Sequence, residues 1–355
     1  MSGIYFHIPF CKTRCFYCDF HTSTDLNLVS PLMEAMMKEL RMRQNYLDKD
    51  RHIQTIYFGG GTPSLLSPDQ IGAMIQEVKN LFLVSDNVEV TVEANPDDLN
   101  RDYLKGLLRV GVNRLSMGVQ STSDCILKSM NRRHSVEDVF NAINNAVDIG
   151  LDNISIDLIY GVPGLSPQLW KTELESIIAL PVDHISAYHL TYHKGTEYYR
   201  RLKKGTLTPV TEEDSLAHFD ILTSVLDDAG FEQYEISNFC RNNKISNHNS
   251  AYWRSVAYLG IGPSAHSFDG INRQWNVSDN QEYINSVSSG DRFYEIEHLT
   301  NEDRYNDYII TSFRTKWGVC DQKLSEYGPL LREFFLRNVD SFVENGEVIN
   351  QNGNW

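Results

Sequence analysis

Six short runs of β-branched and aromatic residues alternate with amphipathic stretches of helical period in the first half of the chain. The runs cover residues 3–9, 55–58, 88–93, 114–119, 154–158 and 184–190, and the stretches cover residues 31–46, 68–81, 101–110, 136–149 and 168–178. This alternation predicts a parallel sheet joined by right-handed helical crossovers. A closed barrel of this type needs eight strand–helix units, and only six are visible. We therefore expect an α/β fold built on an incomplete (β/α)6 TIM-type barrel, whose open side leaves room for a bulky substrate.

Residues typical of helix ends support these boundaries. Ser67 and Ser166 are each followed by a proline, which is favoured in the first turn of a helix. Gly111 and Gly150 stand where glycine is favoured as a helix C-terminal cap. The predicted helices therefore have start and stop signals at several of their ends.

Three cysteines, Cys11, Cys15 and Cys18, follow the first predicted strand in the spacing Cys-x3-Cys-x2-Cys. An iron–sulfur cube is normally held by four thiolates, so three thiolates leave one iron open to another ligand. Disulfides fit poorly, because three neighbouring cysteines cannot pair evenly and no secretion signal precedes them. Structural zinc is the alternative, since His21 could complete a Cys3His site.

The composition narrows the range of partners and compartments. The 355-residue chain has a formal net charge of −15, which argues against nucleic acid and anionic membranes as general partners. No apolar run approaches the length of a membrane span, and no signal-peptide pattern opens the sequence. We predict a cytoplasmic protein without a transmembrane segment, in which any contact with a membrane is peripheral.

Further polar or glycine-rich positions follow the other predicted strands. A Gly-Gly-Gly-Thr run at 59–62 follows the second strand, and Glu93, Gln120 and Asp157 lie at or near the ends of the third, fourth and fifth. Taken singly, such residues are more often caps or turn residues than ligands. Because active sites of parallel barrels lie at the carboxyl ends of the strands, we expect these residues to share one concave face with the cysteines.

The combined motifs resemble those of the radical S-adenosylmethionine (SAM) enzymes, whose hallmark is this cysteine spacing with an aromatic residue, here Tyr17, before the third cysteine. Within that superfamily the chain is similar to the oxygen-independent coproporphyrinogen III oxidases and their relatives, the HemW-type haem chaperones. The similarity is carried by His-Ile-Pro-Phe-Cys at 7–11, Gly-Gly-Gly-Thr-Pro at 59–63, Ser-Met-Gly-Val-Gln at 116–120 and Ile-Asp-Leu-Ile-Tyr-Gly-Val-Pro at 156–163.

The resemblance implies a [4Fe–4S] cluster on the three cysteines and SAM on the open iron. The glycine motif would then lie near the amino group of SAM, the Arg132 guanidinium would suit its carboxylate, and Glu93, Gln120 or Asp157 would accept from its ribose hydroxyls. The cofactor-binding residues expected on these grounds are Tyr5, Tyr17, Gly60, Gly61, Thr62, Glu93, Gln120, Arg132 and Asp157.

Two features favour the chaperone branch of this family over the oxidases. The oxidases carry a further cysteine two residues after the third, where this chain has Phe20. They also have a substantial extension before the cysteine motif, whereas this chain reaches Cys11 almost at once. The further cysteine is not a cluster ligand, so its absence does not decide whether the chain is an enzyme.

A third feature is the stretch His248-Asn-Ser-Ala-Tyr-Trp253, which looks like the His-Asn-x-x-Tyr-Trp motif that the chaperones use for haem. A histidine beside two aromatic residues could ligate haem iron while the rings pack on the macrocycle. The alternative is a loop histidine on a packed Tyr–Trp pair. His7, His189 and His266 are weaker candidates.

The chain changes character after residue 268. Helices are predicted near 280–288, 301–315 and 330–338, and residues 342–349 alternate around Asn-Gly like the start of a hairpin. This pattern predicts a winged-helix-like α+β extension that serves as a lid or docking domain rather than in DNA binding. We expect domains at 1–195, 196–280 and 281–355. We also expect the last of them to be truncated, because a closing strand is expected where the sequence stops.

Two functions follow from the resemblance. The first is a haem chaperone that holds haem or another tetrapyrrole, a [4Fe–4S] cluster and SAM and transfers haem to an acceptor protein. The second is an oxygen-independent coproporphyrinogen III oxidase, which decarboxylates propionates oxidatively in porphyrin biosynthesis. Either function implies an electron donor such as flavodoxin or ferredoxin, and the sequence leaves the enzymatic activity undecided.

Overall fold

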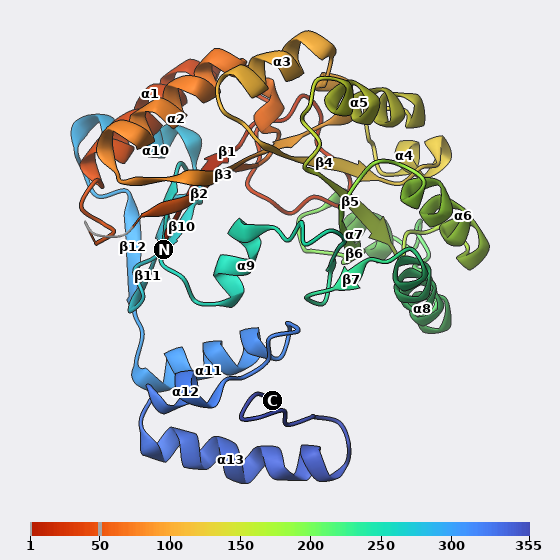
Figure 1. Cartoon of the computed structure of the whole chain (residues 1–355). Helices are drawn as coiled ribbons and strands as arrows, with labels where there is room; N and C mark the ends of the chain where they lie inside the picture. The colour runs from red at the N-terminus through yellow and green to blue at the C-terminus, as the bar shows by residue number, and fades with distance from the viewer. Residues whose placement is uncertain (1, 49–51) are drawn as a thin grey trace.

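A computed structural model of the chain describes residues 2–48 and 52–355. Its centre is a parallel sheet in which six strands lie in sequence order (Figure 1). The strands are β1 (Ser2–Ile8), β2 (Ile53–Gly60), β3 (Val84–Ala94), β4 (Arg114–Gln120), β5 (Ile154–Tyr160) and β6 (His184–His189). Every predicted strand is therefore present, and β3 begins four residues earlier than expected.

The helices that follow these strands cover the outer face of the sheet (Figure 1). They are α1 (Val29–Met42), α2 (Pro68–Leu81), α3 (Arg101–Arg109), the short α4 (Asp124–Ser129), α5 (Val136–Asp148) and α6 (Pro167–Ile178), and three single turns lie at Leu26–Leu28, Pro63–Leu65 and Pro96–Asp98. The predicted caps are confirmed: the Ser67 and Ser166 side chains accept from backbone N–H groups, and Gly111 and Gly150 adopt φ values of +97° and +86°.

Side chains on the six strands alternate between an apolar outer face and a polar inner face, as the pleat requires. The outer face packs against the helices through Ile4, Phe6, Ile56, Phe58, Val90, Val92, Leu115, Met117, Ile154, Ile156 and Ile185. The inner face bears Tyr5, His7, Tyr57, Glu93, Ser116, Gln120, Asp157 and Ser186. A buried parallel strand usually reads as a continuous apolar run, so this alternation marks the inner face as the wall of a polar cavity.

Short strands extend both edges of the sheet. On one side β9 (Tyr258–Ile261) runs parallel to β1 and is followed by antiparallel strands, which are β10 (His266–Phe268), β11 (Asn272–Asn276) and β12 (Tyr294–His298). On the other side β8 (Asn238–Cys240) runs antiparallel to β6 and pairs with β7 (Glu232–Gln233). The resulting 12-stranded sheet has two distinct ends, so the predicted incomplete barrel is confirmed.

Four helices lie in the region between residues 190 and 300. They are α7 (Glu197–Lys203), α8 (Glu212–Asp228), α9 (Asn247–Trp253) and α10 (Asn280–Ser289), and only the last was predicted. His248 therefore lies in a helix and not in a loop, where the alternative to a haem ligand had placed it. No helix in residues 2–48 or 52–355 combines the length and apolar character that crossing a membrane requires.

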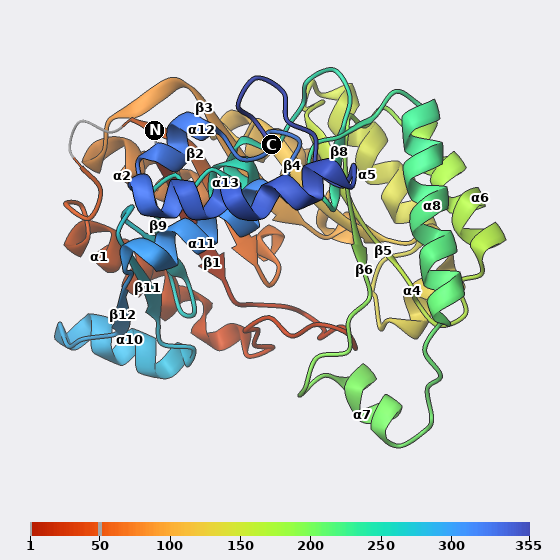
Figure 2. The ribbon, with the colours of Figure 1, turned by 90° about the horizontal axis from the view of Figure 1, so that it is seen from below.

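The C-terminal part is a helical layer with its own buried cluster. Helices α11 (Asn301–Ser312), α12 (Asp321–Ser325) and α13 (Pro329–Glu344) lie beyond α9, and Figure 2 views the molecule from their side. The cluster consists of Tyr305, Tyr308, Val319, Leu324, Phe335 and Val339. The domain boundaries at 195 and 280 stay predictions.

The hairpin predicted at 342–349 is wrong. Helix α13 continues through Glu344, and Gly346 adopts φ +75° just beyond the helix, where the amide of Glu347 donates to the carbonyl of Phe342. The Asn-Gly pair therefore ends a helix instead of turning a hairpin. The backbone then returns to pair residue Trp355 with Val319.

Buried Glu39 fastens the β9–β11 extension to the first helix. Its carboxylate is fully buried on α1 and accepts from the Arg43 guanidinium, the amide of Gly262 and the side chains of Asn276 and Tyr283. Burying a carboxylate is costly unless partners of this kind surround it. The network therefore joins elements more than 200 residues apart in the sequence.

We expect Glu39→Ala to destabilise the protein by about 3–5 kcal/mol, since it leaves the Arg43 charge buried without its counter-ion and removes the acceptor of the Gly262 amide and the Tyr283 hydroxyl. Chemical unfolding followed by circular dichroism measures this loss. The control is Glu34→Ala on the exposed face of the same helix, for which we expect a change below about 0.5 kcal/mol. Equal losses in the two variants would contradict the role of the network.

Candidate functional site

The carboxyl ends of the central strands open into one large cavity. Its volume is about 1130 Å³, and its walls are strands β1–β6, strands β9–β11, the loop after β1, helix α9 and one side of α11. Sites for one small molecule usually occupy about 300–1,000 Å³. The cavity therefore has room for more than one small ligand.

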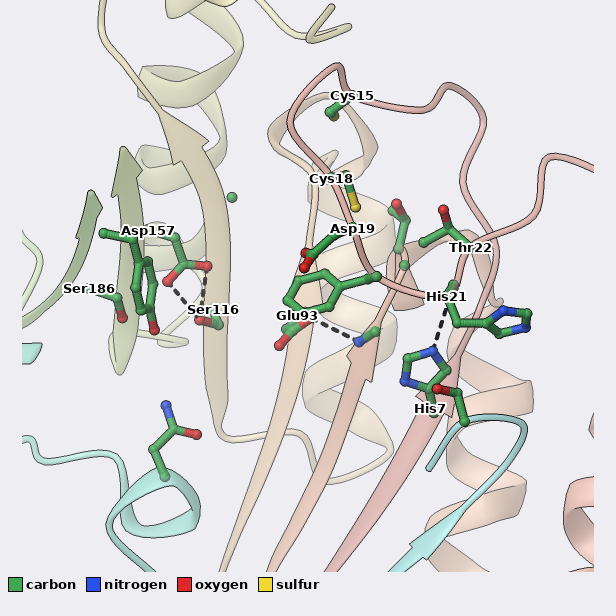
Figure 3. A pocket seen from close by; sticks show the side chains of 18 of the residues that line it. His7, Cys15, Cys18, Asp19, His21, Thr22, Glu93, Ser116, Asp157 and Ser186 are labelled. Atoms are coloured by element: carbon green, nitrogen blue, oxygen red, sulfur yellow. Dashed lines mark hydrogen bonds between the residues drawn. The ribbon is translucent and has the colours of Figure 1, made fainter. Parts of the chain in front are cut away.

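Cys11, Cys15 and Cys18 all line this cavity, as the sequence predicted. They lie on the loop after β1, and Figure 3 shows Cys15 and Cys18 on this loop near the strand ends that carry Glu93 and Asp157. The Thr62 hydroxyl lies 3.4 Å from the Cys11 sulfur, and Arg132 Nη1 lies 3.4 Å from the Cys15 sulfur. Each of these two thiols therefore has a hydrogen-bond donor directed at its sulfur atom.

Burial raises the pKa of Cys11 and raises the pKa of Cys18 to about 11. Both thiols are thus protonated at neutral pH in the protein without metal. Metal ligands must be thiolates, so loading of the site releases protons and binds more strongly as the pH rises.

The cysteine loop is fixed by backbone hydrogen bonds on two sides. Between Cys15 and Tyr17, the amide of Phe16 donates to the carbonyl of Met130, and the carbonyl of Phe16 accepts from the amide of Tyr198 on α7. The Arg201 guanidinium also lies 4.2 Å above the Phe16 ring. Helices α4 and α7 therefore set the position of the loop before any ligand binds.

The zinc alternative finds no support in the geometry. Among the residues that the structure describes, no three His, Cys, Asp or Glu side chains converge on one ion position. His21 Nε2 instead lies 2.8 Å from the Asn280 side-chain oxygen. A cube of iron and sulfide binds each thiolate at a different iron, so its ligands need not converge in this way.

The glycine motif places its backbone against the cysteine loop. Gly60 has φ +110°, and a Cβ atom there would lie 2.7 Å from the His7 ring. A Cβ on Gly61 would lie 2.7 Å from the carbonyl oxygen of Phe10. The amides of Gly60 and Gly61 already donate to Glu93 and Ile8, so a ligand would meet the carbonyl groups of this motif and not its amides. Carbonyl acceptors match the ammonium group expected there.

Arg132 lies between the cysteine loop and the strand ends. Its Nη2 donates to the carbonyl of Gly118 and to the side chain of Asn95, and its Nη1 reaches Cys15. Among described residues its buried Nε has no hydrogen-bond partner. Buried polar atoms without partners are rare in native proteins, so a donor is left for an anionic ligand.

Glu93 and Asp157 form a pair of partly buried carboxyl groups on the inner wall (Figure 3). Glu93 accepts from the Tyr57 hydroxyl at 2.8 Å and the Gly60 amide at 3.1 Å, and Asp157 accepts from the Ser116 hydroxyl. Burial and repulsion from Asp157 raise the pKa of Glu93 to about 7, and burial raises the pKa of Asp157 to about 6. Both groups can accept from hydroxyls of a ligand.

The remaining predicted residues also line the cavity. Gln120 ends β4 with φ +70°, a conformation that ordinary residues rarely adopt. Tyr17 lies beside the cysteines, and the Tyr5 hydroxyl lies 3.0 Å from His7 Nδ1. The His248 ring contacts Thr55 at 2.7 Å and Tyr252 at 2.8 Å, so both of its nitrogens have internal partners. Its role as a haem ligand stays a prediction.

Several residues of the site were not singled out from the sequence. Tyr57 and Asn95 hold Glu93 and Arg132, and Ser116 holds Asp157. The two-residue period of the strands could have found Tyr57 and Ser116, because residues an even number of positions apart project from the same face. Ser116 lies four positions before Gln120, and Tyr57 lies two positions before Gly59. Asn95 has no such signal, because it lies beyond the strand.

The raised pKa of Glu93 predicts a pH-dependent difference in stability. The folded protein binds this proton more tightly than the unfolded chain, whose carboxyl groups titrate near 4.5. The free energy of unfolding therefore falls as the pH rises from about 4.5 to 7, by about 3 kcal/mol for this group. Glutamine does not titrate, so the Glu93→Gln variant should not lose this stability as the pH rises. The melting temperature of the variant minus that of the parent protein should therefore be higher at pH 8 than at pH 5.

Differential scanning calorimetry of the SAM-free proteins measures this difference. Glu175→Gln, on the exposed face of α6, is the control and should show the same offset at both pH values. A constant offset for Glu93→Gln would contradict the raised pKa.

The donor set suits an iron–sulfur cluster with a small zwitterion beside it. Three partly buried thiols line a cavity that also offers a buried guanidinium, glycine carbonyls and two carboxyl groups. An iron–sulfur cluster uses thiolates, and the other groups match the ammonium, carboxylate and hydroxyl groups of SAM.

Comparison with known proteins gives the family. The radical SAM superfamily model matches residues 5–177. The Heme chaperone HemW of Bacillus subtilis is 33% identical over 356 residues, which cover 99% of this chain and 93% of that protein. The Heme chaperone HemW of Mycobacterium tuberculosis (strain H37Rv) is 37% identical over 93% of this chain and 85% of its own.

The fold also has a solved counterpart. The structure of the radical SAM enzyme coproporphyrinogen III oxidase (HemN) from Escherichia coli superposes with a TM-score of 0.85, at 23% identity, over 99% of this chain and 85% of its own. This likeness confirms the incomplete barrel with its C-terminal extension. The superfamily match over residues 5–177 and the identity to the HemW proteins over most of the chain show that it belongs to the radical SAM superfamily and, within it, to the family of the HemW heme chaperones.

Proposed function

We propose that the chain is a haem chaperone, which binds haem in the large cavity and transfers it to an acceptor protein. Membership of the radical SAM superfamily implies a [4Fe–4S] cluster and SAM. Cys11, Cys15 and Cys18 would hold the cluster, and Arg132, Gly60, Gly61, Glu93 and Asp157 would bind SAM. When bound, this pair supplies one-electron chemistry, while the chain orients SAM and limits access of water.

The observation that carries the proposal is the size of the cavity in a chain that resembles the HemW proteins over its whole length. A cavity of about 1130 Å³ accommodates a second, large ligand beside SAM. The full-length relatives are named for haem, and 33% identity over 99% of the chain supports the same cargo here. We extend the proposal to a cytoplasmic location, because an oxygen-sensitive cluster needs a reducing compartment.

The oxidase remains the second candidate, because a coproporphyrinogen III oxidase has the same fold at a TM-score of 0.85. The difference at Phe20 favours the chaperone. This side chain lines the cavity and is 62% exposed, and it stands where the oxidases carry their further cysteine. An exposed ring at a cavity wall offers packing to a planar ligand.

The haem acceptor and the electron donor belong to the proposal as well. A donor such as flavodoxin or ferredoxin must approach the cysteine loop. Helix α7, which contacts Phe16 of this loop, carries the exposed basic residues Arg200 and Lys203, and Lys204 caps it. A basic patch beside the cluster in a chain of net charge −15 suits an acidic electron-transfer protein.

Two parallel assays on the anaerobically reconstituted protein test the proposed function. In the first, ferric haem is titrated in, and a saturable Soret band is expected. In the second, coproporphyrinogen III, SAM and a strong reductant are supplied, and no protoporphyrinogen is expected. Turnover of coproporphyrinogen without a saturable Soret band would overturn the chaperone in favour of the oxidase.

A further inference from the structure

Six histidines line the cavity, and the rings of five of them form hydrogen bonds or ion pairs with other side chains or with the backbone. The rings of His7 and His248 have partners at both nitrogens, and His21 is bonded to Asn280. His189 lies 3.1 Å from the Ser215 hydroxyl, and His193 pairs with Asp19. The sixth, His266, is exposed, and within residues 2–48 and 52–355 no hydrogen bond involves its ring.

The local sequence turns His266 toward the cavity. Strands β9 and β10 fold back closely, so that a Cβ atom on Gly260 would lie 2.0 Å from the carbonyl oxygen of His266. In β10 the middle residue Ser267 is buried and lies 3.0 Å from the Gly260 amide. Because side chains alternate along a strand, His266 and Phe268 project together from the opposite face, which lines the cavity.

The same face carries a row of rings and one cation. In the antiparallel register His266 lies opposite Trp275, and Phe268 lies opposite Tyr258 on one side and Arg273 on the other. Directly opposed residues project from the same face of a sheet. Tyr258, Phe268 and Arg273 line the cavity with His266. The face is therefore broad and aromatic, and at one corner it carries Arg273, which is ion-paired with Glu297 and Asp307.

The opposite wall is the first C-terminal helix. Ile310 on α11 lines the cavity and is 63% exposed, although it is a large apolar residue. Arg273 contacts Asp307 on the same helix, which keeps the two walls in register. This slot lies between β9–β11 and α11. In the sequence these elements are far from the cysteine loop, which follows β1.

We propose that this slot binds the haem and that His266 is the side chain that ligates its iron. The inference deepens the proposed function, on which it rests, and it assigns the ligand to a residue outside the His-Asn-Ser-Ala-Tyr-Trp stretch. An imidazole ligates iron through an unprotonated nitrogen. Partial burial and the charge of Arg273 lower the pKa of His266, so the ring is neutral and available at neutral pH.

Ligation by His248 would require a different arrangement. Its ring lies between Thr55 and Tyr252 and stacks on Tyr57 at 4.8 Å. Either nitrogen would have to lose a buried partner before it could bind iron, and a buried hydroxyl left without a partner costs about 1–3 kcal/mol. His266 has no such partner to lose. In this account His248 fixes α9 against the inner wall.

The test compares His266→Ala, His266→Gln and His248→Ala in cluster-reconstituted protein with ferric haem as the probe. Both His266 variants should lose the histidine-ligated spectrum and bind haem about tenfold or more weakly. Free imidazole should restore an imidazole-ligated spectrum in His266→Ala, because it can enter the space that the missing ring leaves. Metal-free protoporphyrin, which needs no ligand, should bind the parent protein and His266→Ala alike.

The matched control is His193→Ala, an exposed histidine on the same cavity, which should keep the spectrum of the parent protein. Iron content and circular dichroism of each variant confirm that the fold is retained. A parent-like spectrum in both His266 variants, with loss in His248→Ala, would overturn the assignment while the proposed function stands. Absence of haem binding by the parent protein would overturn the proposed function itself.

Discussion

Replacing Cys15 with serine is expected to abolish assembly of the iron–sulfur cluster. Cys15, Cys11 and Cys18 line one cavity, and Arg132 lies 3.4 Å from the Cys15 sulfur. Iron–sulfur clusters select soft thiolate ligands, and a serine hydroxyl is a poor substitute. Iron bound after anaerobic reconstitution should fall from about four ions per chain to nearly none. The broad visible absorbance of the cluster and the binding of SAM should disappear with it.

Cys125→Ser is the matched control, since Cys125 is an exposed free thiol on α4, outside the cavity lining. It should retain the iron content of the parent protein. Circular dichroism of Cys15→Ser should match the parent, because the loop is fixed through Phe16 and not through the thiol. A Cys15→Ser protein with undiminished iron and absorbance would contradict the assignment of this ligand.

Replacing Arg132 with glutamine is expected to weaken SAM binding by about a hundredfold, the equivalent of about 3 kcal/mol. The arginine offers a buried Nε without a partner in the described residues, and its charge lies among the thiols and strand ends. Hydrogen bonds to charged groups contribute about 1.5–3 kcal/mol each. Equilibrium dialysis of SAM against the reconstituted protein measures the change, and iron analysis confirms that the cluster remains.

The neighbouring Arg133 provides the comparison. It pairs with Asp97 and Asp98 through both terminal nitrogens, so its charge is already compensated. Arg133→Gln should weaken SAM binding by less than about threefold, since partly exposed ion pairs contribute little. Equal losses in the two variants would show that general positive charge, and not the donor of Arg132, retains the cofactor.

The first half of the fold could be predicted from the sequence because its signals are local. Strand runs, Ser-Pro starts and C-terminal glycines each act over a few residues, and all six strands and the five predicted helices of that half formed where expected. In the second half the helices predicted near 280–288, 301–315 and 330–338 are present as α10, α11 and α13. Its strands could not be predicted, because strands such as β7 and β10 are two or three residues long and exist only through pairing with the sheet. The Asn345-Gly346 pair was ambiguous, since it ends helices as readily as it turns hairpins.

The site followed the same division. Cys11, Glu93 and Asp157 could be predicted to meet, because strand ends of a parallel barrel converge whatever the details of packing. The hydrogen-bond partners of the His248 ring, and their absence at His266 in the described residues, could not be predicted. They depend on contacts between segments that are nearly 200 residues apart in the sequence. The motif that contains His248 therefore suggested a ligand, and the three-dimensional contacts favour His266.

Mössbauer spectroscopy of the ⁵⁷Fe-reconstituted protein, with and without SAM, tests the central claim most directly. If the three thiolates hold three corners of the cube, one iron differs from the others and is open to SAM. We predict that SAM changes the isomer shift of about one iron in four and leaves the rest unaltered. A protein that holds no cluster, or a cluster in which SAM changes the isomer shift of none of the irons, would contradict the account.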